Sequence, residues 1–69
     1  MTPFRESPEF ARQQEIADAR CRAYDAFVAP GMNRAARRTA KGRMLVALGE
    51  AAALRAELEV LRRHIAEAE

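Results

Sequence analysis

Few side chains in this 69-residue sequence have the type and spacing that catalysis or metal binding requires. It holds one cysteine, Cys21, and one histidine, His64, which is too few for an internal disulfide or for a zinc site with its usual set of about four ligands. The three glycines are dispersed and form no phosphate-binding loop. We therefore expect a non-enzymatic protein without catalytic residues, metal or cofactor. Cys21 is expected to be a small buried hydrophobe and His64 to be solvated.

The most concentrated chemical feature is the stretch MNRAARRTAKGR, residues 32–43, which holds five basic residues and no acidic one. In a continuous helix, one face would carry all of these except Arg43, namely Arg34, Arg37, Arg38 and Lys41. Such a basic face can contact nucleic-acid phosphates, because that contact requires only charge. It can equally meet an acidic protein surface, or only solvent. No aromatic residue lies in the run, which disfavours stacking on single-stranded nucleic acid.

The elements that must position this run are predicted to be helical. Ser7 as N-cap, followed by Pro8 and Glu9, predicts a first helix over residues 7–29. Pro30 and Gly31 predict a turn over residues 30–33. Residues 1–6 are expected to form a flexible arm that carries a lone aromatic, Phe4. The residues expected to pack from the first helix are Phe10, Ala17, Cys21, Tyr24, Phe27 and Val28.

No proline follows the turn, so a second, long helix is predicted over residues 34–68. Its first part, 34–43, is basic, and its second part, 44–68, repeats apolar residues with the heptad spacing of a coiled coil. We call this repeat the apolar seam: Met44, Ala47, Ala51, Leu54, Leu58, Leu61 and Ile65, with Ala68 at its end. The fold class is therefore all-α, a helical hairpin whose long C-terminal helix forms a coiled coil.

Charged residues beside the seam favour a parallel pair of identical chains. Glu50 would face Arg55 of a second copy, and Glu57 would face Arg62, so both contacts join opposite charges. Arg37 would fall on the seam, where two like charges repel, so the seam is expected to begin near Ala40 or Met44. The alternative is an amphipathic helix that packs only on the first helix or on a larger protein.

The opposite side of the second helix carries small residues, Gly42, Gly49 and Ala56, at intervals of seven. They would let a neighbouring helix approach closely, with the first helix the nearest candidate. An alanine-rich coding sequence explains them equally well.

A basic helix leading into a coil resembles the layout of bZIP transcription factors. The basic region of that family reads N-x-x-A-A-x-x-[SC]-R, whereas here Ala35 and Ala36 follow Asn33 one place too early. No base-reading residue is assigned on this basis. The stretch MNRAARR also resembles Met-Asn-Arg-Ala-x-Arg-Arg stretches in small Ala/Arg-rich proteins of tailed bacteriophages and prophages. That resemblance implies a small virion or assembly component.

The leading hypothesis is an assembly protein that associates with itself and with a larger protein assembly. The second is a small dimeric nucleic-acid-binding regulator that contacts phosphates through residues 34–43, and the third is an adaptor whose basic face meets an acidic protein. No apolar run approaches the ~20 residues of a membrane span, and no signal-peptide pattern opens the chain, so we expect no membrane partner. The expected location is the cytoplasm or a virion.

Overall fold

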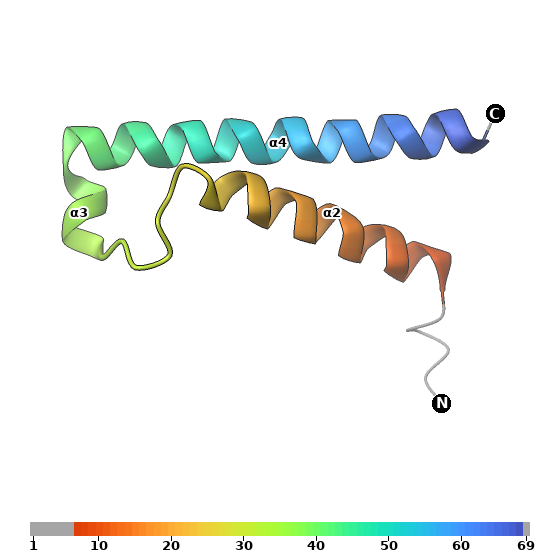
Figure 1. Ribbon diagram of the computed structural model, residues 1–69, viewed down its shortest axis with the longest axis horizontal. Helices are drawn as coiled ribbons and strands as arrows, with labels where there is room; N and C mark the ends of the chain where they lie inside the picture. The colour runs from red at the N-terminus through yellow and green to blue at the C-terminus, as the bar shows by residue number, and fades with distance from the viewer. Residues whose placement is uncertain (1–6, 69) are drawn as a thin grey trace.

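The computed structural model of the chain describes residues 7–68, which form three helices and no strand: α2 (Pro8–Asp25), α3 (Arg34–Arg38) and α4 (Ala40–Ala68). Helices α2 and α4 run side by side in opposite directions, and the short α3 lies across the end where they are joined (Figure 1). The predicted all-α class and the long C-terminal helix are confirmed. The predicted arm over residues 1–6, with Phe4, lies outside the described residues.

Helix α2 begins where the sequence predicts and ends earlier. The Ser7 side chain caps it by accepting a hydrogen bond of 3.0 Å from the backbone N–H of Phe10. The helix ends at Asp25, and the next turn is tighter: the N–H of Phe27 donates to the carbonyl of Tyr24, three residues back, at 3.0 Å, and the N–H of Val28 donates to the same carbonyl at 3.0 Å. The prediction of helix through residue 29 is therefore wrong at its end, and the turn carries Val28 into the core, where it is only 1% exposed.

The second predicted helix is not continuous, because the chain breaks at Thr39. This residue has an extended backbone, with φ of −71° and ψ of 158°, between α3 and α4. Its hydroxyl donates to the carbonyl of Ala36 at 2.8 Å and accepts from the N–H of Gly42 at 2.9 Å. One side chain thus closes α3 and caps the start of α4, satisfying backbone groups that a helix end leaves without partners.

Gly42 permits the sharp angle between α3 and α4. A Cβ atom there would overlap the carbonyl oxygen of Ala36 and would lie 2.9 Å from its carbonyl carbon and 3.0 Å from the Cα of Arg37. These are backbone atoms, so no side-chain rotation could relieve the overlap. The absence of a side chain at Gly42 is therefore a condition for α3 to fold back on α4.

The core lies between α2 and the small-residue side of α4. It consists of Ile16 and Val28 against Ala53 and Val60, and the buried Gly49 lies beneath the Tyr24 ring. A Cβ atom on Gly49 would lie 3.0 Å from Tyr24 Cδ2. The first helix therefore approaches this side of the second closely at Gly49, whereas the close neighbour of Gly42 is α3.

The predicted packing residues of the first helix are wrong in part. Ala17 and Cys21 are exposed and Phe27 is 37% exposed, whereas Phe10 and Tyr24 are half-buried and Val28 is buried. Helix α2 instead turns Ile16 toward α4. The physical reason is that burying Ile16 removes more apolar surface area from water than burying Ala17 or Cys21.

Polar side chains connect the two long helices near their free ends. Glu15 of α2 forms an ion pair with Arg63 and lies 2.8 Å from Nε2 of His64, both on α4. Arg63 also lies 4.0 Å from Glu67, one helical turn further on. The expectation that His64 is solvated is wrong, since its side chain is 27% exposed and it contacts Glu15.

Candidate interaction surfaces

The apolar seam lies on the side of α4 that α2 leaves uncovered. Four of its five large residues are half-exposed or more: Met44 55%, Leu54 60%, Leu58 51% and Ile65 60%. Ala47, Ala51 and Ala68 are also exposed, and Leu61 is half-buried. The opposite side of α4 supplies Gly42, Gly49, Ala53 and Val60, which are buried. Helix α4 therefore has two apolar sides, one used inside the molecule and one open to a partner.

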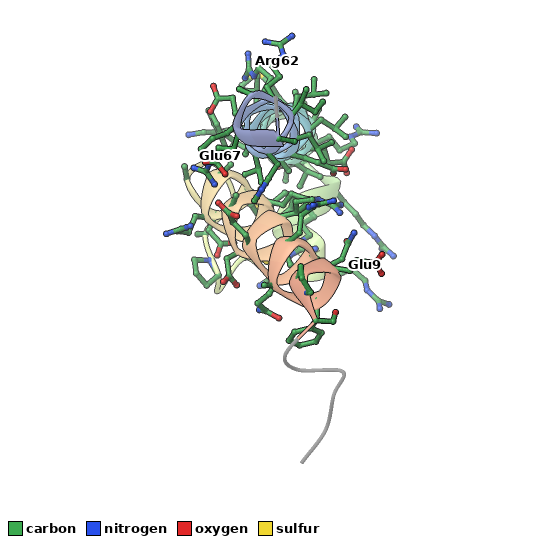
Figure 2. All side chains as sticks on the ribbon, turned by 90° about the vertical axis from the view of Figure 1, so that its right-hand side faces the viewer. Glu9, Arg62 and Glu67 are labelled. Carbon is green, nitrogen blue, oxygen red and sulfur yellow. The ribbon has the colours of Figure 1, made fainter. Side chains whose placement is uncertain are left out.

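Three of the four predicted interchain charges are free to meet a partner. Glu50, Arg55 and Arg62 are exposed and form no ion pair with any described residue. Viewed toward the C-terminal end of α4, Arg62 lies on the side facing away from α2 (Figure 2). Glu57 differs, because its carboxylate lies 3.6 Å from the guanidinium of Arg20 on α2. That contact is long and half-exposed, so it leaves the Glu57 carboxylate accessible to a second cation.

The basic run forms a second surface, which we call the basic elbow: Arg34, Arg37, Arg38, Lys41 and Arg43. The prediction of one helical face through Arg34, Arg37, Arg38 and Lys41 is wrong, because the break at Thr39 places the three arginines on α3 and the lysine on α4. All five side chains are exposed. Within residues 7–68, none of them forms an ion pair. The whole segment from 26 to 49 holds no acidic residue.

Helix stability does not account for the cations at the start of α4. The N-terminal end of a helix carries partial positive charge, and each cation placed there costs about 0.3–1 kcal/mol when exposed. Lys41 and Arg43 lie in the first turns of α4, which has no acidic residue in its first turn. By contrast, Arg37 and Arg38 lie in the last turn of α3, where cations are favourable.

A shallow groove between α2 and α4 is one further concave feature, with a volume of about 300 Å³. It is lined by Ala17, Arg20, Cys21, Tyr24, Asp25 and Ala53. No histidine lines the groove beside the Cys21 thiol to act as its base. Among residues 7–68, no three His, Cys, Asp or Glu side chains gather as metal ligands, and no helix combines the length and hydropathy needed to cross a membrane.

Two site features escaped the sequence analysis. The cap at Thr39 had a local signal, since a Thr preceding a helical stretch is a preferred N-cap, but the alanines and arginines around it favour helix on both sides. The contacts of Glu15 with Arg63 and His64 join residues almost fifty positions apart and leave no local pattern.

No protein-family model, curated protein or solved structure matches the chain.

Proposed function

We propose that the chain is a non-enzymatic interaction protein that associates with a second copy of itself through the apolar seam of α4. The observation that carries the proposal is the line of half-exposed large residues, Met44, Leu54, Leu58 and Ile65, on the side of α4 that α2 does not cover. Monomeric proteins rarely leave a continuous apolar stripe of this length in water.

A second copy fits this stripe better than an unrelated partner, because the flanking charges complement themselves. In a parallel pair, Glu50 meets Arg55 of the partner and Glu57 meets Arg62 of the partner, and two-fold symmetry repeats each contact. In the antiparallel pair that best matches the seam residues, Arg55 would face its own counterpart and so would Glu57. The parallel orientation is therefore the favoured one.

The biological role proposed for such an oligomer is a small virion or accessory component of a tailed bacteriophage, joined to a larger protein assembly. The resemblance of residues 32–38, MNRAARR, supports this part of the proposal. The small size of the chain supports it too, because a domain of this length buries little core and gains stability from association.

Leu58 gives the test of self-association. It is 51% exposed, and complete burial of a leucine is worth about 1.5–3 kcal/mol, so closing the exposed half contributes about 1 kcal/mol per protomer. The two protomers together contribute about 2 kcal/mol to the free energy of association, so Leu58→Ala should raise the dimer dissociation constant about 30-fold. Leu58→Asp should abolish it, because burial would also desolvate two charges.

Sedimentation equilibrium over a range of concentrations measures this effect, with circular dichroism as the check on folding. The matched control is Ala66→Asp, which adds the same carboxylate to an exposed position of α4 outside the seam. We expect the control to dimerise like the parent. A parent chain that remains monomeric and fully helical at the highest concentration would contradict the proposal.

Cross-linking tests the orientation. Met44→Cys, made in a Cys21→Ser background to remove the exposed native thiol, places two thiols opposite each other only in the parallel pair. In the antiparallel pair Met44 would face Ala68, so Met44→Cys would cross-link only when mixed with Ala68→Cys. We expect Met44→Cys to cross-link by itself.

A further inference from the structure

The basic elbow is an exposed, strongly charged surface that the seam does not use. Its five cations are Arg34, Arg37 and Arg38 on α3 and Lys41 and Arg43 on α4. Residues 26–49 carry these five and no acidic residue, whereas residues 1–25 carry four basic and five acidic ones, and residues 50–69 three and five. The excess of basic over acidic residues therefore lies in the segment at the joined end of the helices (Figure 1).

We propose that the basic elbow binds the phosphate backbone of nucleic acid, and that the parallel dimer presents two elbows side by side to it. The pairing of elbows rests on the dimer proposed above, whereas the surface itself does not. Phosphate contact needs cations that are exposed and not already neutralised, and all five meet this condition within the described residues.

The side chains of the elbow suit a phosphate backbone better than an acidic protein. Four of the five cations are arginines, whose planar guanidinium can donate two hydrogen bonds to one phosphate. Helix α3 consists only of arginine and alanine, RAARR, so it offers no large apolar side chain for the dry centre that a protein interface requires. No aromatic residue lies within α3, so base stacking contributes nothing and the contact is with the backbone.

The dimer and the elbow are coupled through repulsion. In a parallel pair both elbows lie at the same end, whereas in an antiparallel pair α4 would hold them roughly 40 Å apart. Ten cations at one end repel each other across distances comparable to the screening length of about 10 Å at 0.1 M salt. A polyanion removes that repulsion, so nucleic acid should strengthen the dimer, and by reciprocity the dimer should strengthen nucleic-acid binding.

Fluorescence anisotropy with a labelled DNA duplex of arbitrary sequence measures the binding. A dimer that neutralises about six phosphates should lose roughly 10³-fold in affinity between about 50 and about 200 mM salt. Replacing Arg34 and Arg37 with Gln removes four cations per dimer and should lower the slope of log affinity against log salt by about 3 to 4. The expected affinity at about 100 mM salt is at least tenfold weaker than that of the parent.

The matched control replaces Arg12 and Arg22 with Gln. Both are exposed on α2 and lie outside the elbow, so the control has the same net charge as the elbow variant. We expect its affinity and salt slope to stay close to those of the parent. Equal losses in the two variants would show that only net charge matters and would overturn the elbow as a site.

Further measurements distinguish nucleic acid from an acidic protein as the partner, and the phosphate-binding proposal from the dimer proposal. The elbow assignment is overturned if the parent shows no duplex binding at about 50 mM salt, or if poly-glutamate competes as well as unlabelled duplex, which would indicate an acidic protein partner. Leu58→Asp, measured in the same assay, should bind more weakly and with about half of the parent's salt slope. If sedimentation shows a monomeric parent whose binding still depends on Arg34 and Arg37, the dimer proposal fails and the phosphate-binding surface stands.

Discussion

Replacing Gly42 with alanine separates two opposing effects at the angle between α3 and α4. Inside a helix, alanine is more favourable than glycine by about 1 kcal/mol, so local propensity predicts that Gly42→Ala stabilises the protein. The tertiary structure predicts the opposite. The new methyl group would overlap the carbonyl oxygen of Ala36 and would lie 3.0 Å from the Cα of Arg37, both of them backbone. Overlap in a well-packed site costs about 1–3 kcal/mol or more, and here no side chain can move aside.

The chain cannot easily avoid this overlap by straightening into one long helix. Val28 packs against Gly49, with Val28 Cγ2 only 3.2 Å from where a Gly49 Cβ would lie. In a straight helix Arg34 would lie about 22 Å along the axis from Gly49. The connection from Val28 to Arg34 reaches about 20–22 Å only when every residue in it is fully extended. We therefore expect Gly42→Ala to displace α3 from α4 and to lower the free energy of unfolding by about 1–2 kcal/mol in net terms.

Urea denaturation followed by circular dichroism measures the stability, and amide exchange at residues 36–42 reports on the elbow. All variants are compared at one protein concentration, because self-association adds to apparent stability. Gly31→Ala is the control, since a Cβ there meets nothing within 4 Å. Gly49→Ala should be intermediate, because its closest neighbour is the ring of Tyr24, which can shift. A Gly42→Ala protein that is more stable than the parent, with unchanged amide protection, would refute the reasoning.

Two other substitutions test the packing of α2 on α4. Val28→Ala should lower the free energy of unfolding by about 2 kcal/mol, because Val28 is 1% exposed and the cavity would be only partly refilled. Urea denaturation measures this change. A loss of stability no larger than that caused by truncating an exposed valine would contradict the burial of Val28 in the core. Glu15→Gln should cost only roughly 0.5–1 kcal/mol, because the ion pair with Arg63 is half-exposed, and the difference from the parent should shrink in concentrated salt. If the Glu15→Gln difference is independent of salt, the contact acts through hydrogen bonding to His64 instead of through charge.

The local sequence pattern correctly predicted the features that depend on a single helix. The start of α2 follows from Ser7, Pro8 and Glu9, because capping involves only neighbouring residues. The all-α class follows from the alanine-rich composition, and the heptad spacing of Met44 to Ile65 identifies one apolar side of α4, although only the structure shows that α2 leaves this side open. Whether that side is covered by a second copy is the proposal that Leu58→Asp tests.

The local sequence pattern did not predict which apolar residues of α2 are buried, because two sets of residues have helical spacing. Ala17, Cys21 and Tyr24 form a regular stripe, and Ile16 lies about one residue step away around the helix. Ile16, Ala23 and Phe27 form a second apolar stripe, and periodicity alone does not decide which of the two stripes is buried. The structure buries Ile16 and exposes Ala17 and Cys21, and burial of the larger side chain removes more apolar surface from water.

The sequence by itself determined that the chain is helical, where the first helix starts, and that its positive charge is concentrated between residues 33 and 43. Only the tertiary structure decided that this charge is divided between two helices. One reason is the packing of Val28 beside Gly49, because a straight helix from Arg34 would then require the connecting residues to be almost fully extended. Thr39 supplies the caps and Gly42 the space that let the chain turn there. A helix propensity is a property of neighbours along the chain, whereas that packing depends on residues about twenty positions apart.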